Sequence, residues 1–353
     1  MWQEKRFKIP MKVILSATRN PQFITITEYI ENALNLLGCE TVFFNNRDFL
    51  IHGRIRDRLP FFYKWDLKRI NKKLISAVRL FKPDLFFEAG GHRIFSETVE
   101  EIKRYGIKTA LWTIDTPTDF KPVIKAASHY DFVFTGGSEA YDILNEKGVK
   151  YIQWLPFACD PEFHKPQILT EDEKKFYGSD VVFVGTVDPV LYPFRVKTLE
   201  ALSDFNLSIW GPGAENIPYD SKIKPLIRGE MTTPEIWTKI YSASKIVLCM
   251  HYKDPEGKIP CHQASPRVYE VLACGAFLMV DEQRDAIKLF KDREELVVFR
   301  DTDELKGLIR YYLEREDERK KIAENGRKKV LMEHTYKHRI GRILMEVVGG
   351  EKI

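Results

Sequence analysis

The chain has 353 residues, enough for two domains that each bury a core of their own. With 44% hydrophobic and 30% charged residues it has the composition of a globular protein, which excludes a disordered chain, and no apolar run is long enough to span a bilayer. A net charge of +4 is too small to favour nucleic acid as a partner, although it suits a site for anionic small molecules.

The first ten residues are charged rather than signal-like, and we expect them to form a leader, residues 1–10, ahead of the first strand. The five cysteines are scattered and never spaced as C-x-x-C, so they imply neither a disulfide framework nor a zinc site. A reducing compartment suits such cysteines. The sequence therefore predicts a cytoplasmic protein with no integral membrane segment.

From Met11 onward, short β-rich segments alternate with stretches that carry apolar residues at helical spacing. We expect strands at 12–17, 41–44, 84–88, 108–114, 132–135 and 151–154. We expect helices at 24–37, 66–81, 96–105, 120–127 and 139–147. The alternation predicts an α/β domain over residues 11–156, with a parallel sheet covered by helices on both faces.

Two polar residues directly follow strands of this first domain. His92 comes after a Gly-Gly pair that lets the backbone approach a ligand closely, and Asp115 directly follows the next expected strand. Ligands of parallel α/β sheets bind beyond the carboxyl ends of the strands, so both side chains are candidates for a site there. The alternative is that each makes only local hydrogen bonds within its own loop.

Residues 155–166 contain three prolines and no periodicity, which is typical of a linker between domains. A second α/β set follows, over residues 157–335. We expect strands at 180–184, 207–210, 245–250, 276–280 and 296–299. We expect helices at 170–176, 194–202, 234–242, 266–274 and 303–313. Residues 314–321 predict a helix with a solvated face, and a final helix within 336–353 carries an apolar side that we expect to cross back to the first domain.

The first turn of the second domain contains Gly185 and Thr186, and a glycine-hydroxyl turn after a buried strand can lie against a diphosphate. Arg195 follows and can supply positive charge, unless it is a solvated helix residue. Trp210 and Gly211 follow the next strand, where they can form a wall for a base.

The stretch 262–281 predicts a capped helix, a glycine stop and a short buried strand. Ser265 suits the N-cap of that helix, and Gly275 suits the residue that ends it. Arg267 and Glu270 lie one turn apart at its start, where free N–H groups favour an anion; Glu270 can accept hydrogen bonds from two adjacent ribose hydroxyls. The alternative is an exposed ion pair between the two residues.

The order of these segments resembles the GT-B glycosyltransferases, most closely the spore-maturation (CgeB-type) glycosyltransferase-like family. The segments that carry the resemblance are residues 112–115, 154–161, 180–186, 265–275 and 325–327. The most specific of them is Arg-x-x-Glu-x-x-Ala-Cys-Gly, residues 267–275. Neither G-x-G-x-x-G after the first strand nor G-x-x-x-x-G-K-[ST] occurs, which argues against a simple dehydrogenase and a P-loop enzyme.

The resemblance implies two Rossmann-like domains that face each other across a cleft, with the acceptor bound mainly by the first and a nucleotide-sugar by the second. It implies that Glu270 holds the donor ribose, that Arg267 and the 185–186 turn lie near the diphosphate, and that Arg195 helps to neutralise it. Related retaining enzymes often carry a second Glu eight residues before the ribose Glu. Here that position is His262, so the stereochemistry of transfer stays open.

The predicted function is metal-independent transfer of a sugar, of the hexosyltransferase type, from a nucleotide-diphosphate donor to an acceptor hydroxyl. A UDP-sugar is the expected donor and no cofactor is expected to be tightly bound; the acceptor is an unidentified glycan, protein or small molecule. An inverting enzyme needs a general base, for which His92 and Asp115 are the candidates. A nucleotide-sugar epimerase and a non-catalytic nucleotide- or sugar-binding scaffold are the alternatives.

Overall fold

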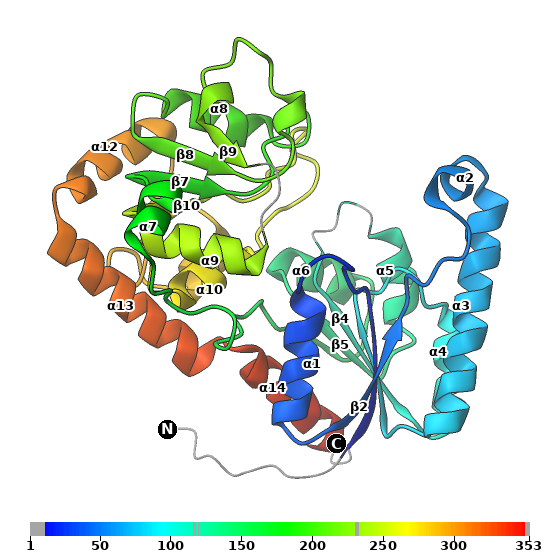
Figure 1. Ribbon diagram of the computed structural model, residues 1–353. Coiled ribbons are helices and arrows are strands. Elements are labelled where there is room, and N and C mark those ends of the chain that lie inside the picture. Colours follow the sequence, from blue (N-terminus) through cyan, green and yellow to red (C-terminus); the bar gives the residue numbers. More distant parts are fainter. Residues whose placement is uncertain (1–10, 116–117, 119, 230–232, 350–353) are drawn as a thin grey trace. The chain divides into compact units, whose positions relative to one another are not determined.

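The computed structural model describes residues 11–115, 118, 120–229 and 233–349 (Figure 1). The predicted leader, residues 1–10, lies outside the described residues. The chain forms two compact units, one containing the residues up to Pro156 together with the C-terminal segment from Tyr336, and the other containing Phe157–Thr335. Within the described ranges, no helix is both long and apolar enough to cross a bilayer.

The first unit is built on a six-stranded parallel sheet in the order β2-β1-β3-β4-β5-β6. Its strands are β1 (Lys12–Ala17), β2 (Glu40–Asn45), β3 (Leu85–Ala89), β4 (Lys108–Thr113), β5 (Phe132–Thr135) and β6 (Ile152–Trp154). The parallel α/β sheet predicted from the sequence is therefore confirmed, and each of these strands begins and ends within one residue of its predicted bounds.

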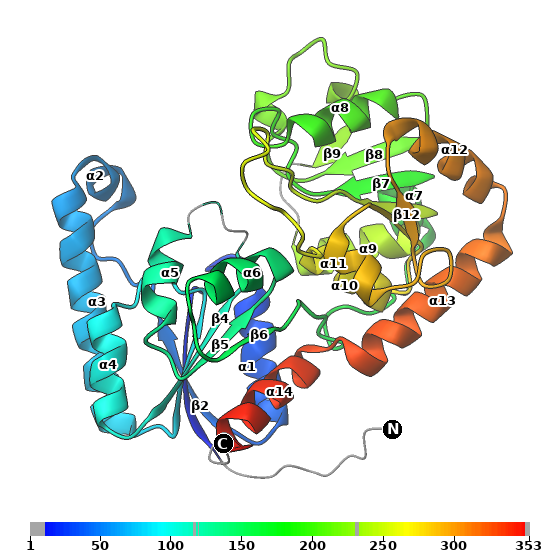
Figure 2. The same ribbon diagram turned by 180° about the vertical axis from the view of Figure 1, so that it is seen from behind.

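Helices cover both faces of this sheet (Figures 1 and 2). They are α1 (Ile26–Leu36), α2 (Gly53–Arg58), α3 (Pro60–Phe81), α4 (Ser96–Arg104), α5 (Lys121–Ala127), α6 (Ser138–Glu146) and α14 (Tyr336–Gly349). On one face, Leu111 of β4 lies in an apolar core with residues of α3 to α6. On the other, the ring of Trp112 lies 6.2 Å from that of Tyr336, at the start of α14, which packs beside α1.

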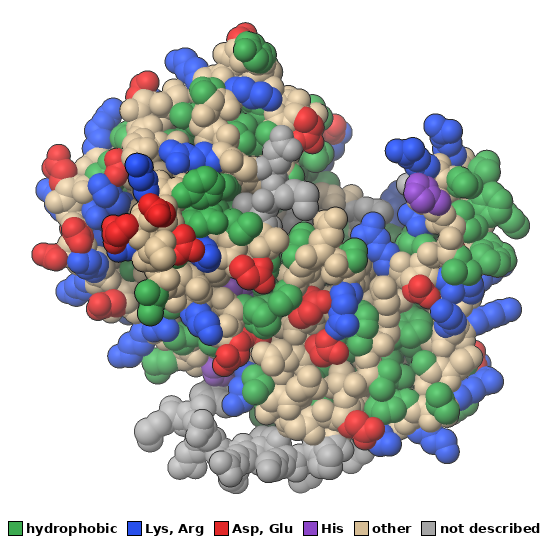
Figure 3. All heavy atoms as spheres, in the orientation of Figure 1, with side chains coloured by type: hydrophobic (Ala, Val, Ile, Leu, Met, Phe, Trp, Pro, Cys, Tyr) green, Lys and Arg blue, Asp and Glu red, His purple; other side chains and the backbone are tan. Residues whose placement is uncertain are grey.

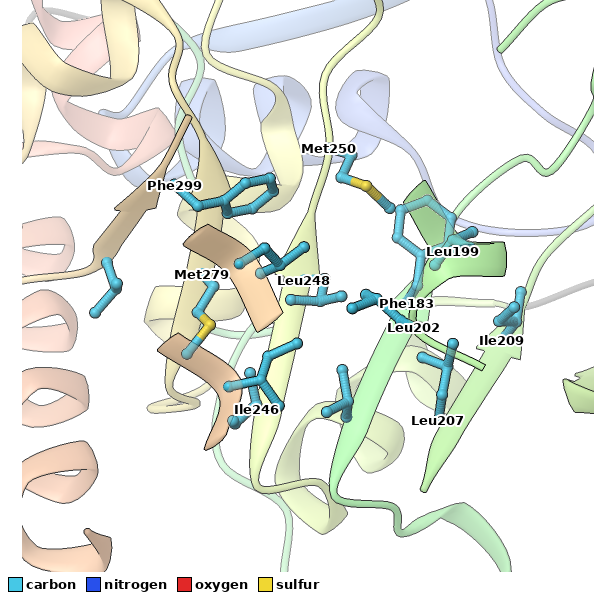
Figure 4. Packing of buried hydrophobic residues seen from close by; sticks show 14 of the residues in the cluster. Phe183, Leu199, Leu202, Leu207, Ile209, Ile246, Leu248, Met250, Met279 and Phe299 are labelled. Carbon is cyan, nitrogen blue, oxygen red and sulfur yellow. The ribbon is translucent and has the colours of Figure 1, made fainter. Parts of the chain in front are cut away.

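The second unit contains another six-stranded parallel sheet, in the order β12-β11-β10-β7-β8-β9. Its strands are β7 (Val181–Val184), β8 (Leu207–Trp210), β9 (Ile227–Gly229), β10 (Ile246–Cys249), β11 (Leu278–Asp281) and β12 (Val297–Phe299). Its α-helices are α7 (Glu171–Tyr177), α8 (Pro193–Ala201), α9 (Pro234–Ala243), α10 (Pro266–Ala273), α11 (Arg284–Leu289), α12 (Thr302–Leu313) and α13 (Glu316–Glu333). Figure 4 shows the core on one face of this sheet, where Phe183, Leu248 and Met279 from neighbouring strands pack with Leu199 of α8.

Helix α13 is longer than the charged helix predicted at 314–321, and it is buried along one side. Gly326 allows α13 to approach α10 closely, because a Cβ at this position would lie 2.7 Å from Leu272 Cδ2 and 2.2 Å from the carbonyl oxygen of Glu295. The next residue, Arg327, donates from Nε to the carbonyl oxygen of Ala273 at 3.1 Å, at the last turn of α10. The segment 325–327 therefore fixes the position of α10.

The strand order reverses at one point in each sheet. In the second unit, β8 and β9 lie on one side of β7, whereas β10, β11 and β12 lie on the other. Ligands of parallel α/β sheets bind beyond the carboxyl ends of the strands at such a reversal. In the second unit the loops at this reversal follow β7 and β10. In the first unit the corresponding loops follow β1 and β3.

Candidate functional site

Arg195, in the first turn of α8, joins the two loops at the reversal in the second sheet. Its Nη1 donates to the carbonyl oxygen of Thr186, after β7, at 2.8 Å, and its Nη2 donates to that of Met250, after β10, at 2.7 Å. The guanidinium lies 3.9 Å from the ring centroid of Tyr192, and Nε has no hydrogen-bond partner in the described part of the chain. Burial lowers the pKa of Arg195, but an arginine remains charged at neutral pH. The predicted cation is thus held at the reversal point and is not a solvated helix residue.

Gly185 and Gly211 bring the turns after β7 and β8 into contact. Gly211 has a φ of +140°, and a Cβ there would lie 2.2 Å from the carbonyl oxygen of Gly185. The N–H of Gly185 donates to the carbonyl oxygen of Trp210 at 2.8 Å. The indole of Trp210 is buried, with its ring 5.9 Å from that of Phe176 and 5.8 Å from that of Tyr177. The side chain of Trp210 therefore serves the packing of β8 against α7, and the close-packed glycines shape the turns.

Helix α10 begins as its sequence predicts. Ser265 is the N-cap, Pro266 occupies the first turn, and the Ser265 hydroxyl accepts from the N–H of Arg267 at 3.4 Å. Gly275 follows the helix with a φ of +69°, the left-handed conformation that glycine adopts most readily. The local capping signals were enough to place this helix because they depend on residues adjacent in the chain.

Arg267 and Glu270 do not pair with each other in the described part of the structure. Arg267 donates from Nη1 to the hydroxyl of Tyr241 at 2.9 Å and lies over the ring of Trp237, 5.4 Å from its centroid. Glu270 is 7% exposed, and its carboxylate accepts no hydrogen bond from the described residues. Its nearest charge partner among them is Nε2 of His164, at 3.9 Å. The exposed ion pair considered from the sequence is therefore not formed.

His164 belongs to the proline-rich segment interpreted as a linker, and from residue 157 that segment is packed into the second unit. Cys159 donates its N–H to the carbonyl oxygen of His334 at 2.9 Å, and the N–H of Asp160 donates to Nδ1 of His164 at 3.0 Å. Because Nδ1 accepts, the ring proton sits on Nε2, which faces Glu270. Burial lowers the pKa of His164, which keeps the ring neutral.

A His–Asp pair that the sequence did not predict lies at the carboxyl ends of β10 and β11. Oδ1 of Asp281 accepts from the backbone N–H of His251 at 2.9 Å and from its Nδ1 at 2.6 Å. The His251 side chain is 2% exposed, and its Nε2 has no hydrogen-bond partner within the described ranges. His251 directly follows Met250, which Arg195 holds, so the pair lies at the reversal point. The only sequence signal is that each residue comes at or just after a buried strand.

His262 is tied to helix α11 instead of to α10. Its Nδ1 forms a hydrogen bond with Nη1 of Arg284 at 3.2 Å, and its carbonyl oxygen accepts from the N–H of Asp285 at 3.1 Å. His262 also lines a surface hollow beside α11, together with Gln283 and Ile287. None of these contacts reaches Arg267 or Glu270.

The two candidates for a general base do meet in the first unit. Nε2 of His92 lies 2.9 Å from Oδ2 of Asp115, and His92 sits in the loop after β3, at the reversal point of that sheet. Glu88, four residues earlier, is fully buried and accepts a hydrogen bond from the hydroxyl of Tyr130. Burial raises the pKa of Glu88 to about 7.

The fold is shared with solved glycosyltransferase structures. A sucrose-phosphate synthase from Thermosynechococcus elongatus superposes with a TM-score of 0.71 at 12% identity, over 96% of this chain and 100% of that one. A glycosyltransferase from Rickettsia africae gives 0.65 at 14% identity, over 96% and 99%. The Anabaena protein HepE, in complex with UDP-glucose, gives 0.63 at 10% identity, over 96% and 100%. The chain has the GT-B fold.

In sequence, residues 194–345 match the model of a family described as glycosyl transferase-like. Among curated proteins, none matches the chain. The matched part of this GT-B chain includes Arg195, His251, Arg267 and Glu270, the polar side chains at the reversal point and at the start of α10. It begins after the glycine turn at Gly185.

Proposed function

We propose that the protein is a glycosyltransferase that binds a nucleotide-diphosphate sugar in its second unit, with Glu270 on the ribose. The observation that carries this proposal is the Glu270 carboxylate, which is 7% exposed yet accepts no hydrogen bond from the described residues. Buried carboxylates are normally hydrogen-bonded, and two adjacent ribose hydroxyls are donors of the required kind. The position of Glu270 one turn into a capped helix, within the glycosyl transferase-like match, supports the same role.

The donor diphosphate would bind at the N-terminal end of α10 and the reversal point. Free N–H groups at the start of α10, the guanidinium of Arg267 and that of Arg195 offer positive charge to its oxygens. Nε2 of His251, which has no hydrogen-bond partner in the described part of the chain, would lie beside the diphosphate. We propose that these groups stabilise the charge on the leaving diphosphate and that a metal ion is not required.

The reaction joins an acceptor oxygen to the anomeric carbon of the sugar while the bond from that carbon to the diphosphate oxygen breaks. The bonding electrons leave with the diphosphate. The acceptor hydroxyl loses its proton. In an inverting reaction His92, whose Nε2 is held by Asp115, would take that proton at Nδ1 or through a water. His262 at the position of a second Glu leaves the retaining and inverting outcomes both open to test.

UDP is the proposed nucleotide, because structures with the same fold include complexes with UDP-glucose and with UDP-2-fluoro glucose. Within the GT-B enzymes we propose a relative of the spore-maturation (CgeB-type) family, on the Arg-x-x-Glu-x-x-Ala-Cys-Gly segment. The acceptor is proposed only as a hydroxyl-bearing glycan, protein or small molecule.

A thermal-shift screen against UDP, GDP, ADP and TDP, and against their sugars, tests the proposal. A ligand that binds only the native protein raises its apparent melting temperature. We expect UDP and UDP-sugars to give the largest rise, without added divalent metal. If none of these nucleotides raises the melting temperature, the protein does not bind such a donor and the proposed function is wrong.

A further inference from the structure

The loop before α2, helix α2 and the first turns of α3 expose an unusual number of large apolar side chains. The exposed ones are Leu50, Ile55, Leu59, Phe61, Tyr63 and Trp65, which we call the 50–65 patch. Phe61 is 72% exposed, and Leu50 is 65% exposed. Scattered exposed apolar residues are normal, but a cluster of this kind marks a surface that contacts something. This surface lies outside the groups proposed to bind the donor.

The same segment is strongly basic. Residues 47–73 contain nine Lys and Arg residues against three Asp, a net charge of +6, whereas the whole chain carries +4. Two of the three Asp residues already have basic partners within the segment: Asp48 lies 2.7 Å from Nζ of Lys73, and Asp66 lies 3.3 Å from Nε of Arg69. Figure 3 shows green apolar and blue basic side chains side by side over α2 and the start of α3.

The fold holds these side chains outward. The Asp66 carboxylate, buried in α3, accepts from the N–H groups of Leu50 and Ile51 at 3.1 and 3.0 Å, which ties the loop before α2 to α3. Burial acts to raise the pKa of Asp66, but these two backbone bonds and Arg69 together lower it. Arg56 lies over the ring of Phe49, 4.1 Å from its centroid. The exposed apolar side chains therefore belong to a loop and helices that are held in place by hydrogen bonds and packing.

We propose that the 50–65 patch docks on the surface of a membrane that contains anionic phospholipids. Trp, Phe and Leu side chains insert at the level of the headgroups, and neighbouring Lys and Arg side chains reach the lipid phosphates. A second copy of the chain is a poor occupant, because two surfaces with a net charge of +6 repel each other. This proposal does not depend on the proposed sugar transfer.

The test is flotation of the full-length protein with two kinds of vesicle, one of phosphatidylcholine alone and one with about one third phosphatidylglycerol. We expect at least tenfold more protein on the anionic vesicles, and high salt should release it. The variant Phe61→Ser/Trp65→Ser should lose at least tenfold of that binding, and Arg54→Gln/Arg58→Gln/Lys64→Gln should lose the preference for anionic lipid.

Leu80→Ser is the matched control, because Leu80 is 88% exposed at the other end of the same helix. Leu80→Ser should bind anionic vesicles as the unchanged protein does. All variants should have the same melting temperature as the unchanged protein. The proposal is overturned if the unchanged protein does not float with anionic vesicles or if Phe61→Ser/Trp65→Ser floats equally well. It is also overturned, in favour of self-association, if the unchanged protein is a dimer that Phe61→Ser/Trp65→Ser converts to a monomer.

Discussion

The carboxylate of Glu270 lies 3.9 Å from Nε2 of His164, and it accepts no hydrogen bond from the described residues. A neutral histidine at that distance shields one side of the carboxylate without satisfying it. Glu270 is therefore a largely buried acceptor that is open to hydrogen bonds from a ligand or from water.

Replacing Glu270 with Ala should weaken UDP binding by roughly 10- to 100-fold, because hydrogen bonds to a charged group contribute about 1.5–3 kcal/mol. Uridine should be weakened to the same extent, since the lost contacts are to the ribose. Isothermal titration calorimetry measures both. Glu235→Ala, an exposed residue in the first turn of α9, is the control. Equal UDP affinity for Glu270→Ala and the unchanged protein would remove Glu270 from the site.

Replacing His251 with Ala should weaken binding of the diphosphate without weakening binding of the nucleoside. The side chain is proposed to contact only the diphosphate, so UDP affinity should fall about tenfold while uridine affinity stays the same. Asp281→Asn should have a smaller effect in the same direction, because it weakens the bond that orients the ring at Nδ1. A loss of affinity that is the same for uridine and UDP would instead indicate a general collapse of this edge of the sheet.

Replacing Gly211 with Ala should lower the free energy of unfolding by more than about 2 kcal/mol. The new Cβ would meet the Gly185 carbonyl oxygen at 2.2 Å on a backbone with a φ of +140°. Gly307→Ala, in the middle of α12 with no atom within 4 Å of its Cβ position, should instead be stabilising by roughly 0.5–1 kcal/mol. Urea unfolding distinguishes them; a Gly211→Ala variant as stable as Gly307→Ala contradicts the packed-turn description.

Glu88 should make the stability of the first unit depend on pH. Its pKa is raised from 4.5 to about 7 by burial, so between these values the folded protein keeps a proton that the unfolded chain releases. The contribution of Glu88 to the stability of the folded state is therefore largest below pH 4.5. This contribution is lost as the pH rises through about 7. The difference in unfolding free energy between the unchanged protein and Glu88→Gln should fall by roughly 3 kcal/mol from pH 5 to pH 8. Glu97→Gln, an exposed residue on α4, is the control. If the difference in unfolding free energy between the unchanged protein and Glu88→Gln did not depend on pH, the raised pKa of Glu88 would be contradicted.

Sequence patterns were sufficient where the signal is local. The cap at Ser265 and the stop at Gly275 place α10. Short β-rich runs between helices place the strands of the first sheet and all strands of the second except β9, which was not predicted. Helix α2 and the first turns of α3 were not predicted, because residues 53–65 alternate arginine with apolar residues and end in adjacent aromatics without a helical period. Their apolar side chains point to solvent, so no core-facing stripe exists to be recognised.

Contacts between distant segments could not be read in this way. His251 and Asp281 meet because β10 pairs with β11, and His164 meets Glu270 because a proline-rich segment folds back onto the second unit. The tie from Arg195 to both Thr186 and Met250 likewise depends on the strand order. In each case the residue types were visible in the sequence, but their partners were set by the tertiary fold.

The most direct test of sugar transfer is product analysis by NMR after incubation with UDP-glucose and no added acceptor. A glycosyltransferase should slowly release UDP and free glucose as water replaces the acceptor, and Arg267→Met should abolish this release while retaining its melting temperature. Recovery of the donor as a different UDP-sugar would contradict the account in favour of an epimerase. Tight binding of UDP-glucose with no product, even when a pool of hydroxyl-bearing acceptors is added, would contradict it in favour of a binding protein.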